Sequence, residues 1–158
     1  MVAFRQSDGQ VAWQSGDFRN SASSPLLIDV SGAPQLVAFL YEEVTGFDPR
    51  DGRLLWRYPH VTEYGLNVSL PVWGGDGLLF ISAAYGGGSR VLRVTREADR
   101  SSVEELWQSR LMRLHFGNAV RLGDFVLGSS GDFGPAPLTA IDVRTGQVLW
   151  RNRSLARA

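Results

Sequence analysis

Three polar residues occupy equivalent places along the chain and are the first candidates for a binding site. Ser21, Asn67 and His115 each lie four residues before the expected start of a strand. Their hydroxyl, amide and imidazole groups can form hydrogen bonds, so side chains converging from successive repeats could hold a small ligand or a protein segment. The same groups can instead cap strands and bind loop backbone. Three neighbours complete the candidate set: Tyr64, Arg113 and Asn118.

Catalytic and metal chemistry have little support in the residue types. His60 and His115 are the only histidines, and a metal would need both of them together with carboxylates from other repeats. The sequence has no cysteine and no nucleophile with distinguishable histidine and acid partners. The glycines at 86–88 precede no expected helix, so they do not predict a phosphate-binding loop. We therefore predict no catalytic residue and no metal site in this chain.

A repeated phrase must position the candidate residues. SDGQVAW, RDGRLLW and RTGQVLW end at Trp13, Trp56 and Trp150, and a further tryptophan, Trp107, lies between the last two. Successive tryptophans are 43, 51 and 43 residues apart, about the length of one four-stranded propeller blade. We expect the four indoles to pack between sheets as structural residues. Each phrase also contains a tight turn that needs a glycine with positive φ: Gly9, Gly52 and Gly146.

The repeats divide a single domain, 1–158, into one partial and three full blades. Segment 2–13 supplies two strands, and full blades are expected over 14–57, 58–108 and 109–151. Blade 58–108 is longer than its neighbours, and we expect READRSSV (96–103) to form a polar hairpin tip that absorbs part of the excess. Closing a ring takes four to eight blades, so we expect a fragment of a seven- or eight-bladed ring. The alternative is closure by a second copy.

The composition argues against two classes of binding partner. Sixteen basic and sixteen acidic residues give no net charge, which does not favour nucleic acid or an anionic membrane surface. Every basic residue is an arginine, and the arginines are scattered rather than gathered into an anion-binding patch. No apolar run is long enough to span a membrane, and Met1 leads directly into the first repeat without a signal peptide.

The phrases resemble the pyrroloquinoline-quinone-type propeller repeat, whose tryptophan-docking phrase reads Ala-x-Asp-x-x-x-Gly-x-x-x-Trp. Ala140 to Trp150 (AIDVRTGQVLW) fits every fixed position. Gly46 to Trp56 (GFDPRDGRLLW) lacks the alanine, and Ala3 to Trp13 (AFRQSDGQVAW) lacks the aspartate. The third repeat keeps only Trp107. The resemblance covers the whole chain and implies an all-β protein, a β-propeller of four-stranded antiparallel blades.

The resemblance also bears on cofactors. Quinone-dependent alcohol dehydrogenases with this repeat add a pair of cysteines, a tryptophan beneath the quinone and a calcium site with Glu, Asn and Asp ligands. This chain has no cysteine, and Asp48 and Asp142 belong to docking phrases, where the resemblance implies that they fix turns. No cofactor is expected here. Pyrroloquinoline quinone and calcium enter only if the chain is part of such a dehydrogenase.

Two functions remain. The first is a non-catalytic scaffold or binding module within a larger bacterial protein, which presents loops and a channel mouth to a ligand or a protein. The alternative is part of a quinone-dependent dehydrogenase whose catalytic residues lie outside this chain. The expected partners are further blades, another protein or a second copy that closes the ring. The resemblance implies a periplasmic or secreted location.

Overall fold

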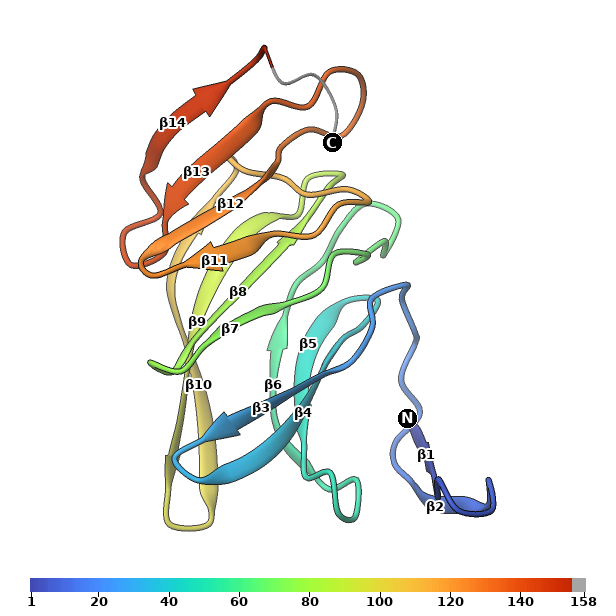
Figure 1. The fold of residues 1–158 in the computed structure, drawn as a ribbon. Helices are drawn as coiled ribbons and strands as arrows, with labels where there is room; N and C mark the ends of the chain where they lie inside the picture. Colours follow the sequence, from blue (N-terminus) through green and yellow to red (C-terminus); the bar gives the residue numbers. More distant parts are fainter. Residues whose placement is uncertain (155–158) are drawn as a thin grey trace.

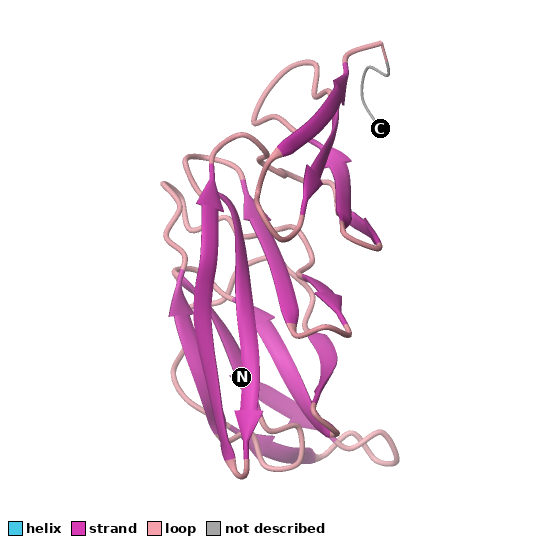
Figure 2. Cartoon of the chain, turned by 90° about the vertical axis from the view of Figure 1, so that its left-hand side faces the viewer, coloured by secondary structure: helices cyan, strands magenta, loops and turns pink. Residues whose placement is uncertain are grey.

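The computed structural model describes residues 1–154, which form β-strands and no helix (Figure 2). The strands assemble into three four-stranded sheets and one two-stranded sheet, with antiparallel pairing throughout the described residues. In every sheet the strands follow sequence order, so each neighbour is reached by a hairpin connection. The fold is the partial β-propeller that the repeated phrases predict.

The sheets follow one another along the chain, as Figure 1 shows from blue to red. The leading half blade pairs β1 (Val2–Phe4) with β2 (Val11–Gln14). The second blade contains β3 to β6: Leu26–Val30, Ala33–Phe39, Glu43–Phe47 and Leu54–Pro59. The third blade contains β7 to β10: Val72–Gly74, Leu78–Ala83, Gly88–Glu97 and Arg100–Ser109. The fourth blade contains β11 to β14: Val120–Leu122, Phe125–Ser129, Leu138–Asp142 and Val148–Asn152.

The two ends of the blades carry different connections. One end, here the loop face, gathers connections that follow even-numbered strands, among them those after β6, β8, β10 and β12: 60–71, 84–87, 110–119 and 130–137. The opposite end, the turn face, gathers the tight turns that follow odd-numbered strands β3 to β13 and the β1–β2 turn (Figure 1). Candidate residues at 64, 67, 113, 115 and 118 all belong to connections of the loop face.

The hydrophobic core lies between blades. Successive side chains of a strand point to opposite faces of its sheet, and β8 is buried on both faces. Leu79 and Ile81 therefore pack with Val37 and Phe39 of the second blade. Phe80, on the other face, packs with residues of the fourth blade, among them Val126 and Ile141. Each blade is thus held by burial against its neighbours.

The hairpin tip predicted in READRSSV lies there, but it is shorter than expected. Strand β9 continues to Glu97, β10 begins at Arg100, and these two residues pair across the hairpin. Only Ala98 and Asp99 form the tip, with Ala98 at φ 52°. The additional residues therefore lengthen two paired strands, because cross-strand pairing satisfies backbone groups that an open loop would leave to water.

Candidate functional site

Two of the predicted ligand-binding residues, Ser21 and Asn67, form hydrogen bonds with the backbone of the connections. The Ser21 hydroxyl accepts a hydrogen bond from the Asn67 backbone N–H at 2.8 Å and lies 2.9 Å from the Asn67 carbonyl oxygen. Asn67 is fully buried, and its Nδ2 donates to the carbonyl oxygens of Leu40 at 2.6 Å and His60 at 3.3 Å. These contacts tie the chain before β3 to the connection between β6 and β7. Neither side chain presents its polar atoms on the loop face.

Asn118 and Arg113 lie nearer the surface. Asn118 Oδ1 accepts the backbone N–H of Leu70 at 2.8 Å, which links the third and fourth blades. The Arg113 guanidinium pairs with Asp132 at 3.1 Å, and the Arg113 backbone N–H donates to Ser130 Oγ. Arg113 is therefore held on the loop face beside the connection between β12 and β13.

The structure brings the other two candidates, Tyr64 and His115, together through Tyr85. The Tyr85 ring centroid is 5.0 Å from that of Tyr64 and 4.8 Å from that of His115, both in edge-to-face geometry. Phe116 stacks on His115 at 3.7 Å, and Phe133 lies 5.5 Å from Tyr85. Edge-to-face and offset contacts are the favourable arrangements for aromatic rings. We call these five residues the aromatic cluster.

The backbone at Tyr85 orients the cluster. Tyr85 has φ 50°, a left-handed conformation that a bulky residue rarely adopts, and Gly86 continues the turn at φ 82°. The Tyr85 carbonyl accepts the Glu63 backbone N–H at 3.1 Å, which joins this turn to the connection that carries Tyr64. The strained turn thus aims the Tyr85 ring between two blades instead of along its own sheet.

Three rings of the aromatic cluster face solvent. Tyr64, Phe116 and Phe133 are 55%, 76% and 79% exposed, respectively. Exposed apolar rings gathered from separate connections are typical of binding surfaces rather than of monomer surfaces in general. Sequence reasoning missed Tyr85, Phe116 and Phe133, although Phe116 adjoins His115 and Phe133 lies in the glycine- and proline-rich segment 128–137.

A groove adjoins the cluster and shares Phe133 with it. Its volume is about 510 Å³, and its lining includes Arg110, Leu111, Arg113, Asp132, Phe133 and Arg151. Three guanidinium groups face one carboxylate there, so the groove has a positive balance of charge. Arg151 Nη2 also donates to the Leu111 carbonyl oxygen, which fixes one side of the groove.

The two histidines lie in different environments. His60 is fully buried against Phe39, and its Nδ1 accepts from Arg90 Nε at 3.1 Å. Burial, together with the Arg90 charge, lowers the pKa of His60 to about 3, so the ring is neutral at physiological pH. His115 belongs to the aromatic cluster instead. Across residues 1–154, no three His, Cys, Asp or Glu side chains are grouped to hold a metal ion.

The described residues do not fit a quinone and calcium site. Besides lacking a grouped set of metal ligands, the chain uses the carboxylates of its docking phrases locally. Asp48 binds Arg50 at 2.7 Å, and this hydrogen-bonded pairing lowers the pKa of Asp48 to about 2. Asp142 Oδ1 accepts the backbone N–H groups of Arg144 and Thr145 at 2.8 and 2.9 Å. Both carboxylates therefore fix turns.

The stacked four-stranded sheets, together with the tryptophan phrases, define a partial β-propeller of the quinoprotein type. The family model described as outer membrane protein assembly factor BamB matches residues 1–152, and the chain belongs to this family.

Comparison with solved structures supports the same fold. A europium-containing methanol dehydrogenase is 18% identical, with a TM-score of 0.56. The match covers 86% of this chain and 25% of the dehydrogenase chain, so this chain spans about a quarter of that protein's length. None of the curated proteins compared with the chain matches it. Within the part of the chain that the structure describes, no helix is long and apolar enough to cross a membrane.

Proposed function

We propose that this chain is a non-catalytic binding module that holds extended segments of other proteins on its loop face. The observation that carries the proposal is the aromatic cluster, in which three rings from three different connections are more than half exposed beside a groove. Rings held by a rigid scaffold bind with little loss of side-chain entropy, and aromatic residues are frequent anchors of protein interfaces.

The family description supports a role in the assembly of outer membrane proteins. Strands of such proteins alternate apolar and polar residues and are rich in aromatic residues near the membrane interfaces. A strand that has not yet folded would offer its apolar side chains to the aromatic cluster. The same description supports a periplasmic or secreted location, where such segments are exposed.

The groove favours acidic side chains in the bound segment. The lining of the groove contains three arginines and one acidic residue: Arg110, Arg113, Arg151 and Asp132. Arg113 already pairs with Asp132. The positive charges of the other two arginines, Arg110 and Arg151, can therefore attract a carboxylate of the bound segment. Charge complementarity of this kind raises association rates and sets the register of the bound segment more than it adds affinity.

The alternative, part of a quinone-dependent dehydrogenase, has the likeness to the methanol dehydrogenase in its favour. It predicts that the full-length protein, which would carry the catalytic residues, binds pyrroloquinoline quinone with calcium and has a higher thermal midpoint when both are present. The binding module predicts no such shift. Thermal unfolding with and without both additives separates the two proposals.

A fluorescently labelled peptide of alternating Phe and Asp tests the binding module by anisotropy. We expect saturable binding that weakens at least tenfold in the double variant Phe116→Ser and Phe133→Ser, because the exposed anchors are removed. The matched control is Leu27→Ser, since Leu27 is 62% exposed on β3 and lies outside the cluster. A peptide of alternating Ser and Asp should bind far more weakly. Equal binding by the double variant and the wild type would refute the proposal.

A further inference from the structure

A cavity of about 250 Å³ lies on the turn face, between the second and third blades. Its lining residues come from three short segments: 32–35, 48–55 and 96–101. The first two contain the turns that follow β3 and β5, and the third contains the tip of the β9–β10 hairpin (Figure 1). The cavity is at the end of the blades opposite the aromatic cluster, so it is separate from the surface proposed above to bind peptide segments.

The third repeat leaves room for this cavity because it lacks a docking turn. At the junctions on either side, an indole reaches the glycine turn of the next blade: Trp13 lies against Gly52, and Trp107 lies against Gly146. At this junction, Trp56 instead donates its indole N–H to Gln35 of its own blade, at 2.7 Å. Among the described residues, no indole therefore bridges the β5–β6 turn and the β9–β10 tip.

The lining of the cavity is rich in charge. It contains three arginines and two aspartates: Arg50, Arg53, Arg96, Asp48 and Asp99. Arg50 binds Asp48 through two hydrogen bonds, of 2.9 Å from Nε and 2.7 Å from Nη2. Arg53 Nη2 lies 3.6 Å from the same carboxylate, which is too far for a hydrogen bond. Arg53 is thus paired only loosely and keeps N–H donors for another acceptor.

Arg96 is the second arginine whose donors are weakly used. Its Nη2 lies 3.4 Å from Asp99 Oδ1, longer than the roughly 2.7–2.9 Å of a charge-assisted hydrogen bond. The Asp99 side chain is fully exposed, so water competes with this contact. Arg96 itself is half-buried, and it lies on the same face of β9 as Val94, which packs against the second blade. Its guanidinium is therefore held at the junction of the two blades.

A hydroxyl group lies beside Arg96. Ser101 pairs with Arg96 across the hairpin, so their side chains share one face of the sheet. Ser101 Oγ accepts from Gln35 Nε2 at 2.9 Å, and a hydroxyl that accepts one hydrogen bond still has its own hydrogen to donate. Gln35 is fully buried, and Trp56 fixes the other end of its amide. The amide thus orients Ser101 before any ligand binds.

We propose that this cavity binds a phosphate group, held by the guanidinium groups of Arg53 and Arg96 and by the Ser101 hydroxyl. Guanidinium N–H pairs match the oxygens of phosphate in bidentate geometry. The lining has a balance of one positive charge, and displacement of the exposed Asp99 raises it to two. That charge fits a phosphate, which carries about −1.5 to −2 at pH 7, better than a single carboxylate. The small volume favours inorganic phosphate or the phosphate of a small ester.

Isothermal titration calorimetry, at an ionic strength held constant with chloride, measures the binding of inorganic phosphate. We expect saturable one-to-one binding by the wild type, weakened at least fivefold by Arg53→Gln and by Arg96→Gln. Arg93→Gln is the matched control and should bind as the wild type does, because Arg93 is exposed on the opposite face of β9. A second titration with glycerol 3-phosphate shows whether the cavity prefers the free ion or an ester, and either preference supports the site.

Asp99→Ala should change the affinity in the opposite direction. Removal of the carboxylate that competes for Arg96 should strengthen phosphate binding at least twofold, a gain that misfolding cannot produce. Circular dichroism checks that every variant folds, and each should still bind the Phe and Asp peptide, because that surface lies at the other end of the blades. The proposal would be overturned by a wild type that binds no phosphate. It would also be overturned if Arg53→Gln and Arg96→Gln weakened binding no more than Arg93→Gln, which would indicate general attraction of an anion to arginines.

Discussion

Trp56 donates its indole N–H to the side-chain oxygen of Gln35, at 2.7 Å, and not to a carbonyl of the next blade. Both residues are buried, and Gln35 Nε2 donates in turn to Ser101 Oγ at 2.9 Å. Ser101 belongs to β10, so the amide carries the connection from the second blade to the third.

The reason lies in the third repeat. Its β9–β10 hairpin has no Asp-x-x-x-Gly turn, so it offers no carbonyl and glycine on which Trp56 could seat. The lengthened hairpin brings Ser101 to that place instead, and the Gln35 amide bridges the gap. A buried indole N–H needs an acceptor, and the amide oxygen meets that need.

Gln35→Leu should therefore destabilise the chain by about 2–3 kcal/mol, because it keeps most of the side-chain volume but leaves the Trp56 N–H buried without a partner. Urea unfolding measures the change. Ser101→Ala is the matched control, and its cost should stay below about 1 kcal/mol because Ser101 is partly exposed and water can replace it. Equal costs for the two substitutions would show that Trp56 does not depend on Gln35.

Gly52 gives a second prediction, because the Trp13 ring lies against it and Trp13 Nε1 donates to the Pro49 carbonyl oxygen at 2.9 Å. Gly52→Ala adds the strain of a left-handed residue, about 1–2 kcal/mol. The added Cβ would also lie 2.4 Å from the Trp13 ring, which must therefore move. Gly32→Ala is the control, because Gly32 has φ 79° and open space around the position of its Cβ. We expect Gly52→Ala to cost at least about 2 kcal/mol more than Gly32→Ala in urea unfolding. A smaller difference would mean that the half blade is held by other contacts.

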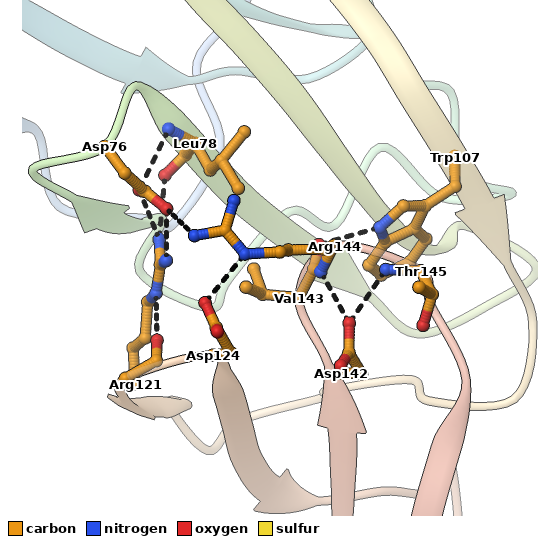
Figure 3. A network of polar contacts seen from close by, with 10 residues as sticks. Asp76, Leu78, Trp107, Arg121, Asp124, Asp142, Val143, Arg144 and Thr145 are labelled. Atoms are coloured by element: carbon orange, nitrogen blue, oxygen red, sulfur yellow. Dashed lines mark hydrogen bonds and ion pairs between the residues drawn. The ribbon is translucent and has the colours of Figure 1, made fainter.

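A network of charges joins the third and fourth blades at the turn face (Figure 3). Asp76 binds Arg121 at 2.7 Å and Arg144 at 3.3 Å, and Arg144 also pairs with Asp124 at 2.9 Å. The hydrogen bond from Arg121 lowers the pKa of Asp76. The Arg121 side chain is only 11% exposed, so it depends on this carboxylate.

Asp76→Ala should lower stability by about 1–2 kcal/mol, since hydrogen bonds to charged groups are stronger than neutral ones and Arg121 is left largely buried. Asp99→Ala removes the fully exposed partner of Arg96 at the β9–β10 tip and should change stability by less than about 0.5 kcal/mol. Thermal unfolding at low and high salt measures both. An equally small effect at Asp76 would show that the blades do not rely on the network.

The architecture could be predicted from the sequence because three of the repeats contain the same short local phrase. A glycine turn, a short apolar strand and a tryptophan depend on residues a few positions apart, so the repeat of that phrase gives the sheet order without any tertiary information. The extension of β9 and β10 into READRSSV was not foreseen because seven of its eight residues are not large apolar ones, and only pairing across the hairpin makes its two ends strands.

The candidate site was harder to predict. Ser21, Asn67 and His115 hold equivalent sequence positions, but equivalence does not fix which way a loop side chain points. Ser21 and Asn67 turn toward loop backbone, whereas His115 joins an aromatic cluster. Tyr85 and Phe133 enter that cluster from separate connections, and the left-handed φ of Tyr85 that directs its ring has no signal in residue type.

The buried His60 makes stability depend on pH. Its ring faces Arg90, which is paired with Glu105, and Glu105 also accepts from the Tyr58 hydroxyl at 2.9 Å. Burial and the Arg90 charge lower the pKa of His60 from 6.5 to about 3 in the folded chain. In the unfolded chain the ring takes up a proton near pH 6.5, so protons favour unfolding below that pH. The contribution of His60 is complete above pH 6.5 and is lost as the pH falls toward 3.

We expect that loss to approach, as an upper limit, about 1.4 kcal/mol per pH unit between pH 6 and 4. His60→Gln keeps an acceptor for Arg90 but does not titrate. The effects of all other ionisable groups on the free energy of unfolding therefore cancel when the wild type is compared with this variant. The stability advantage of the wild type over His60→Gln, measured by urea unfolding at pH 7, 6, 5 and 4, should shrink as the pH falls. An advantage that stays constant across this range would mean that His60 accepts a proton in the folded state as readily as in the unfolded state, and that its burial is relieved by local opening of the connection between β6 and β7.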